Sequence, residues 1–107
     1  MKYMLLFIGG NIPESKKKQG IEDRLTWMND LRSRGKFVDG SPLKSSGKTI
    51  DHKVVMQFTH DSDSINGYAV LDVKGINEAV AIAGTAPQLK PGYGSARVEI
   101  RPLLPLL

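Results

Sequence analysis

Two histidines are the residues of this sequence best suited to exchange protons near neutral pH. Each stands beside an aspartate, His52 after Asp51 and His60 before Asp61. An imidazole oriented by a carboxylate is the minimum equipment for general acid–base catalysis. Adjacent residues of a strand point to opposite faces, so neither pair is a ready-made dyad. His60 and Asp61 are our candidate catalytic residues, because they open a turn-rich loop just before the strand that starts near Gly67.

Metal binding has little support in the sequence. There is no cysteine, which excludes disulfides, thiolate nucleophiles and cysteine-ligated metal centres. If residues 53–59 are extended, about 8 residues at ~3.3 Å each separate His52 from His60 by roughly 26 Å, too far for one ion to bind both. His60, Asp61 and Asp63 could bind a cation weakly, but Asp and Ser in such loops more often form turns. We therefore predict no metal site.

Glycine-rich segments suggest phosphate or dinucleotide binding only when they have a particular spacing and precede a helix. Gly9-Gly10-Asn11 and Gly92-Tyr93-Gly94 lack both features. We expect turns at both places and no cofactor.

The chain carries a formal net charge of +4, to which the run Lys16-Lys17-Lys18 contributes. This run follows a Gly- and Pro-containing segment and predicts a solvated loop, with a phosphate-binding patch as the alternative. RNA-recognition sheets need exposed aromatic residues, whereas Tyr3, Phe7 and Phe58 lie in strands that we expect to be buried. Nucleic-acid binding through the basic loop is therefore a disfavoured alternative. No stretch approaches the roughly 20 apolar residues of a membrane span. We expect a cytoplasmic protein with no membrane partner.

The segment from Gly67 to Gly84 is the clearest structural unit. Tyr68 to Val73 is an apolar, β-branched run typical of a strand. From Ile76 the period changes, and an apolar stripe on a short helix follows. The stripe consists of Ile76, Ala79, Val80 and Ala83.

The first half of the chain predicts a strand and a longer helix. Tyr3 to Ile8 is apolar at every position, which favours a central strand whose two faces are both covered. The helix is predicted at about Glu22 to Arg34, and Gly35 ends it. Its expected core stripe is Ile21, Leu25, Met28 and Leu31. Trp27 lies at the margin of this stripe and is either a core-edge residue or the wall of a pocket.

Three further strands complete the prediction. A short one is expected near Pro42 to Ser46, and a regular one from Asp51 to Thr59 with Val54, Met56 and Phe58 on its apolar face. The last strand buries Ala96, Val98 and Ile100. This order of elements predicts one α+β domain over residues 1–107, a split βαβ arrangement with two helices on one face of an antiparallel sheet.

The sequence resembles the YCII-related family and, within it, the DGPF-type proteins. The likeness covers most of the chain. The matching pieces are Met1-Lys2-Tyr3-Met4-Leu5-Leu6, Trp27, Leu31, Gly35, Gly40, Leu43, Gly67-Tyr68, Glu78-Ala79, Ala86-Pro87 and Val98-Glu99-Ile100-Arg101-Pro102. The resemblance implies a ferredoxin-like fold and a dimeric α+β barrel.

Two family motifs are not retained. The Asp-Gly-Pro-Phe motif falls on Val55-Met56-Gln57-Phe58, where only the Phe is kept. Members of the YCII group carry a His in the first helix as part of an acid–base dyad, and this helix has no His. The dyad therefore cannot be carried over.

These observations favour a small homodimer that binds a small organic ligand in a cleft between sheet and helices. Trp27, Phe58 and Tyr68 are the expected ligand-binding residues, and whether the protein is an enzyme is left open. The rival hypothesis is a non-catalytic interaction or scaffolding module. The dimer follows from strands that are apolar on both faces, since two helices can cover only one face of a sheet.

Overall fold

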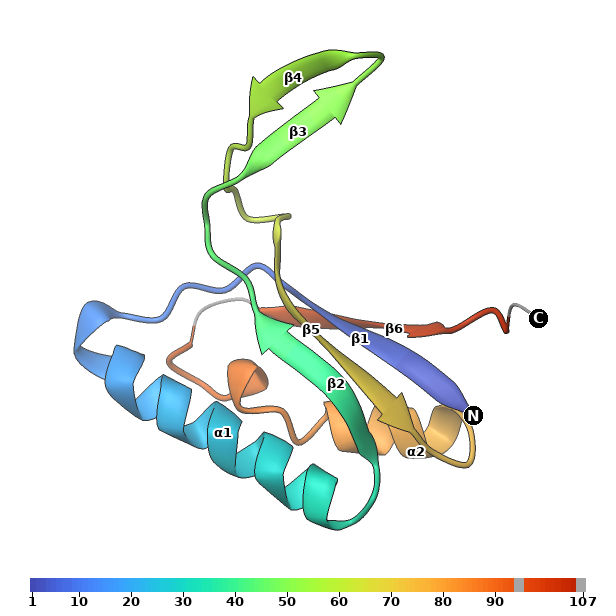
Figure 1. Ribbon diagram of the computed structural model, residues 1–107. Coiled ribbons are helices and arrows are strands. Elements are labelled where there is room, and N and C mark those ends of the chain that lie inside the picture. Colours follow the sequence, from blue (N-terminus) through green and yellow to red (C-terminus); the bar gives the residue numbers. More distant parts are fainter. Residues whose placement is uncertain (94–95, 106–107) are drawn as a thin grey trace.

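The computed structural model describes residues 1–93 and 96–105 and consists of a sheet, two helices and a projecting hairpin (Figure 1). Four strands form an antiparallel sheet in the order β2-β5-β1-β6. They are β1 (Lys2–Ile8), β2 (Phe37–Pro42), β5 (Ile65–Asp72) and β6 (Arg97–Pro102). The helices α1 (Lys17–Ser33) and α2 (Ile76–Ala83) connect β1 to β2 and β5 to β6. The predicted ferredoxin-like α+β fold is confirmed.

Strand β1 lies in the interior of the sheet, as its continuous apolar run predicts. Leu5 is opposite Ala69 of β5 on one side and Ile100 of β6 on the other. Both edges of the strand are therefore hydrogen-bonded, and its side chains alternate between the two faces of the sheet.

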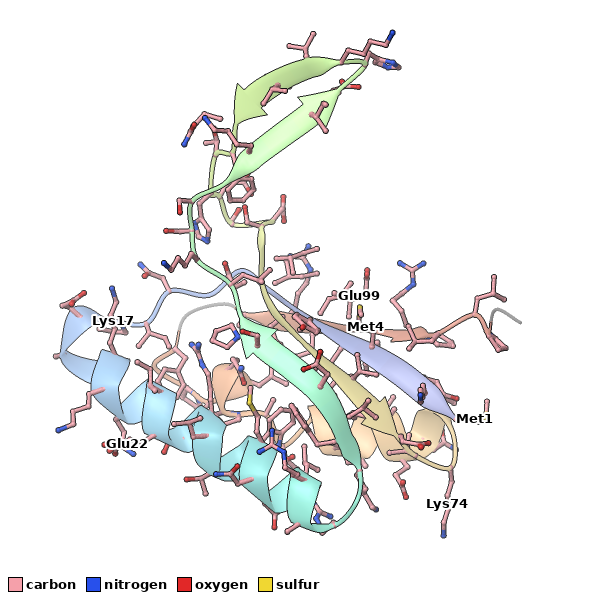
Figure 2. The ribbon with its side chains drawn as sticks, viewed as in Figure 1. Met1, Met4, Lys17, Glu22, Lys74 and Glu99 are labelled. Carbon is pink, nitrogen blue, oxygen red and sulfur yellow. The ribbon has the colours of Figure 1, made fainter. Side chains whose placement is uncertain are left out.

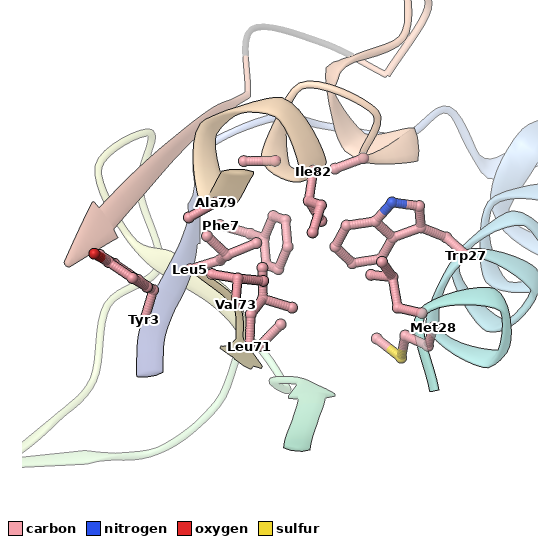
Figure 3. Close-up of a cluster of buried hydrophobic side chains, with 13 residues drawn as sticks. Tyr3, Leu5, Phe7, Trp27, Met28, Leu71, Val73, Ala79 and Ile82 are labelled. Carbon is pink, nitrogen blue, oxygen red and sulfur yellow. The ribbon is translucent and has the colours of Figure 1, made fainter. Parts of the chain in front are cut away.

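The core lies between one face of the sheet and the two helices (Figure 3). Leu5, Leu31 and Leu71 are its largest fully buried side chains. Burying each of them contributes about 1.5–3 kcal/mol. Phe7 and Trp27 meet edge to face, with ring centroids 6.1 Å apart. The core thus joins β1, β5 and both helices.

Helix α1 differs from its prediction in where it begins and in which face it buries. It begins at Lys17, and a short 3-10 turn η1 (Glu14–Lys16) precedes it, so the lysine run does not form a loop. Ile21 and Leu25 were expected in the core but are 57% and 54% exposed. Met28 and Leu31 are buried as predicted, together with Trp27 and Gly20. An added Cβ at Gly20 would lie 3.1 Å from Cδ1 of Ile12. This close approach turns the Gly20 side of the helix inward.

Helix α2 begins at Ile76 as predicted, but its buried stripe is displaced. Ile76 and Val80 are half exposed, whereas Ala79, Ile82 and Ala83 are buried. In both helices the apolar spacing is helical, yet the packing selects a neighbouring side.

Strand β2 occupies Phe37–Pro42 and not the predicted residues 42–46. Gly40 explains this placement, because it lies opposite Ala69 and an added Cβ would meet the Tyr68 carbonyl oxygen at 2.8 Å. A glycine permits this approach of the two strands, and the sequence offers no such site at residues 42–46.

The strand predicted over residues 51–59 is confirmed only at Val54–Gln57, and the rest of its range is wrong. A hairpin of β3 (Lys48–Asp51) and β4 (Val54–Gln57) occupies this region, forms its own two-stranded sheet and projects away from the helices (Figure 1). His52 and Lys53 form the turn with φ values of 45° and 74°, the left-handed conformation that tight hairpins use. Every residue of both strands is exposed. The alternation of Val54 and Met56 reflects a strand, but nothing in the described chain packs on it.

The face of the sheet opposite the helices is called the open face here. Met4 and Leu6 of β1 and Tyr68 and Val70 of β5 point to it and are only half-buried. Figure 2 shows Met4 and Glu99 on this side, away from both helices. Within the described residues no element covers it.

After β6, Leu103 and Leu104 are exposed, and the leucines at 106 and 107 lie outside the described residues. Among residues 1–93 and 96–105, neither helix has the length and apolar character needed to traverse a lipid bilayer.

Candidate ligand-binding cleft

A cleft of about 300 Å³ lies where the sheet ends beside the first half of α1. The ends of β1 and β2, the start of β5 and the segment around Tyr93 form its other walls. Gly9 and Gly10 turn the chain sharply away from β1 with φ values of 70° and 83°. A Cβ at Gly10 would lie 2.9 Å from that of Ala96, so this turn requires a glycine.

One face of α1 supplies most of the helical wall. Lys17, Ile21, Arg24 and Met28 line the cleft, and their spacing places them on one side of a helix. This spacing is visible in the sequence, although the sequence pattern predicts Ile21 in the core. The Ile21 side chain, which is 57% exposed, therefore faces the cleft as well as solvent.

His60 lines the cleft and is held by a chain of hydrogen bonds. The His60 Nε2 and Asn66 Oδ1 atoms are 2.7 Å apart, and Asn66 Nδ2 donates to the Gly9 carbonyl oxygen at 2.6 Å. Because the Gly9 carbonyl can only accept, the amide nitrogen of Asn66 must face it and the amide oxygen must face His60. His60 therefore donates from Nε2. In its neutral form Nδ1 carries the lone pair and is available as a base.

Asp61, the other predicted catalytic residue, does not orient His60. Asp61 Oδ1 accepts hydrogen bonds from the Asp63 backbone nitrogen at 2.8 Å and from Ser64 Oγ at 3.3 Å. Ser64 Oγ in turn accepts from the Asp61 backbone nitrogen at 2.9 Å. Asp61 thus builds the turn, and the partner of His60 is Asn66. Sequence reasoning missed Asn66 because its role depends on the distant Gly9 carbonyl.

The three predicted ligand-binding aromatics are at different places. Trp27 lies in the core, where its Nε1 donates to Thr85 Oγ1 at 2.9 Å, and it is not part of the cleft wall. Phe58 follows the projecting hairpin and borders a separate shallow depression. Tyr68 is among the lining residues at the start of β5, but its side chain points to the open face, where its hydroxyl donates to Asp39 Oδ2 at 3.1 Å. Of the predicted residues, the structure brings His60 and Tyr68 to the cleft.

Arg24 is the unexpected charge in the cleft wall. It is partly buried, and this burial lowers the pKa of its guanidinium, while nearby Tyr93 acts in the opposite direction. Within the described residues no carboxylate forms an ion pair with it. Burial without a counterion costs free energy, so the cleft would favour an anion at this position.

The adjacent carboxylate Asp23 is already engaged. It accepts hydrogen bonds from Gln19 Nε2 at 2.8 Å and from the Tyr93 hydroxyl at 2.9 Å. These bonds, that from Gln19 first, lower the pKa of Asp23. The same bond to Asp23 raises the pKa of Tyr93. Asp23 therefore holds the Tyr93 hydroxyl and is not directed to Arg24.

The cleft has the means to hold a small molecule and to exchange a proton with it. Phe7, Ile12, Ile21 and Met28 provide apolar walls, Arg24 a positive charge and His60 a proton acceptor. Among residues 1–93 and 96–105, no three His, Asp or Glu side chains are grouped as a metal ion would require.

Comparison with known proteins supports the fold. No family model and no curated protein matches the chain. A solved structure is similar: 5-chloro-2-hydroxyhydroquinone dehydrochlorinase (TftG) from Burkholderia phenoliruptrix AC1100, in complex with 2,5-dihydroxybenzoquinone. The TM-score is 0.58 at 14% sequence identity, and the match covers 97% of this chain and 94% of that chain. At this identity the likeness shows a shared fold: the chain has the ferredoxin-like α+β architecture.

Proposed function

We propose that the protein binds a small organic ligand in the cleft and that His60 exchanges a proton with it. The observation that carries this proposal is the composition of the cleft. Its volume of about 300 Å³ is that of a small ligand site, and apolar walls surround a few polar groups.

His60 is suited to act as a general base because its ring is held in place. Asn66 fixes Nε2 as the donor and is itself anchored on the Gly9 carbonyl. Nδ1 can then accept a proton from an acidic C–H or O–H group of the ligand and return it in a later step. Asn66 is the positioning residue in this scheme.

The comparison favours a ring compound as the ligand. TftG, which shares the fold, is described in complex with 2,5-dihydroxybenzoquinone. A single substituted six-membered ring is small enough for the cleft. The resemblance of the sequence to the YCII-related family agrees with a small-molecule role, and the non-catalytic interaction module is the alternative.

The second part of the proposal is that two copies of the chain pair through the open face. Its half-buried apolar residues Met4, Leu6 and Val70 are surrounded by side chains of both signs. The charged side chains on this face are Lys2, Asp39, Asp72, Arg97, Glu99 and Arg101. A two-fold interface places the same surface on both partners, so a mixture of signs around an apolar centre is self-complementary.

Filling the cleft tests the ligand site. Ile21→Trp adds a bulky side chain to the cleft wall, whereas Leu25→Trp adds it to a similarly exposed position outside the cleft. Amide chemical shifts of each protein are followed during titration with 2,5-dihydroxybenzoquinone, benzoate and benzamide. In the wild type and in Leu25→Trp, we expect the probes to shift the amide signals of Gly9, Asn66 and Gly67. In Ile21→Trp, the apparent affinity for the probes should be at least about tenfold lower. If Ile21→Trp bound the probes as tightly as the wild type, the proposed ligand site would be wrong.

A further inference from the structure

Arg24 sets the chemical class of ligand that the cleft can hold. We infer that the cleft selects a ring compound bearing an acidic oxygen, a carboxylate or an ionised hydroxyl, which binds the Arg24 guanidinium. This inference rests on the proposed function and deepens it by naming the ligand class.

The argument starts from the charges that surround the cleft. Lys17, the other basic side chain in the wall, has its Nζ 2.8 Å from Glu14 Oε2 and so already has a carboxylate partner, in an exposed ion pair. Asp23 next to Arg24 holds Gln19 and Tyr93. Arg24 is the cationic side chain of the wall that lacks a carboxylate among the described residues. An anionic ligand group would replace the hydration that the Arg24 guanidinium loses through partial burial.

The shape of the guanidinium narrows the anion further. Its planar fork matches two oxygens of one group, such as a carboxylate, and gives stronger and more directional binding than an ammonium group. The neighbouring walls, Phe7, Ile21 and Met28, are apolar and suit a ring rather than a free phosphate or a nucleotide.

Gln88 supplies a second and independent requirement. Gln88 lines the cleft, its Oε1 atom is buried, and no described residue donates a hydrogen bond to that atom. A buried acceptor without a donor is unfavourable, and a hydroxyl on the ligand could supply the missing hydrogen bond. The geometry therefore favours a ring acid that also carries a hydroxyl group.

The test compares probes that differ in charge but not in shape. Benzoate and benzamide are nearly isosteric, and 3-hydroxybenzoate adds the hydroxyl. Their dissociation constants are measured by titration calorimetry on the wild type, Arg24→Gln, Arg24→Lys and Lys18→Gln. Lys18 lies on the same helix outside the cleft, so Lys18→Gln is a control that removes the same charge.

We expect the wild type and Lys18→Gln to bind benzoate about tenfold or more tightly than benzamide, and 3-hydroxybenzoate more tightly still. Arg24→Gln should reduce the preference for benzoate to about twofold while leaving benzamide unchanged. Arg24→Lys should be intermediate, because it keeps the charge but loses the fork.

The outcomes separate the two proposals. If benzamide binds as well as benzoate, and Ile21→Trp blocks both, the ligand site holds and the acidic class is refuted. If Arg24→Gln and Lys18→Gln weaken benzoate equally, the effect is one of net charge and the role of Arg24 is refuted. If no probe binds in the wild type up to its solubility limit, both proposals fall.

Discussion

The two faces of the sheet differ although the same strands form both. On β1, Leu5 faces the helices and is 0% exposed, whereas its neighbour Leu6 faces the open side and is only half-buried. On β5, Leu71 and Val70 differ in the same way. The side chains are alike in hydrophobicity, so what separates the faces is the cover that the chain provides. An apolar side chain on the open face can therefore be fully buried only by a second molecule.

Removing a buried leucine should have the largest effect. Leu5→Ala deletes a fully buried side chain and should reduce the free energy of unfolding by about 2–5 kcal/mol. Leu6→Ala on the next residue shortens a side chain that its own chain leaves half-buried, so in the single chain it should cost less than half as much, and any larger loss would come from cover by a second copy. Urea denaturation at one fixed protein concentration measures both. Equal losses would mean that the open face is buried as completely as the covered one.

Placing a charge on the open face should separate the proposed dimer. The wild type should sediment at about twice the 11.7 kDa chain mass at low micromolar concentration. Leu6→Asp buries a carboxylate in the centre of the interface, so it should sediment as a folded monomer or lose stability with dilution. Leu25→Asp makes the same change on the exposed side of α1 and should remain dimeric. A wild-type monomer would refute the dimer.

The smallest effect concerns a tyrosine on the open face. The hydrogen bond from the Tyr68 hydroxyl to Asp39, followed by the charge of Asp39, raises the pKa of Tyr68 above its ordinary value of 10.0. Because the folded pKa is raised, the stabilisation is fully present below pH 10.0, and is lost as pH rises through the folded value. Asp39→Ala should lower the pKa of Tyr68, while Tyr93 serves as an internal control because it is bonded to Asp23.

Tyrosinate absorbance during alkaline titration, assigned by single Tyr→Phe variants, measures both groups. If Tyr68 is also covered by a second copy, its shift should grow with protein concentration, because burial disfavours the ionised form. A Tyr68 titration unaffected by Asp39→Ala would show that this hydrogen bond is absent in solution.

The parts of the fold that the sequence predicted are those dominated by continuous apolar runs. The central position of β1 and the β5–α2 unit follow from long apolar segments, each of which buries one face against the core. The errors lie where the sequence pattern has two solutions. The spacing of apolar residues in α1 is helical, but whether Ile21 or Trp27 faces the sheet depends on the close approach at Gly20.

The hairpin shows that a strand pattern does not determine whether the strand is buried or where the chain turns. Alternation over Val54 to Phe58 indicates extended backbone, yet it does not reveal whether another element covers the apolar side. The turn at His52 and Lys53 contains no glycine, although both residues have positive φ. The usual hairpin signal was therefore missing, and one longer strand was the natural prediction.

The candidate site was partly visible in the sequence. His60 was selected for its chemistry and does lie at the cleft, together with Tyr68. Asn66, Arg24 and Gln88 were missed, because their significance comes from hydrogen bonds and burial between distant segments. Of these three residues, Arg24 alone could have been found from the sequence, since its spacing from Ile21 and Met28 places all three on one side of α1.

The hairpin of β3 and β4 gives the molecule two levels of cooperativity. Among the residues that the structure describes, its strands pair with each other and with no strand of the main sheet, and their side chains are exposed. Opening it would break few contacts, so its amide hydrogens should exchange with solvent through local unfolding. Those of β1, bonded on both sides, would exchange only when the whole sheet opens. The hairpin can thus open without breaking the strand pairs of the main sheet.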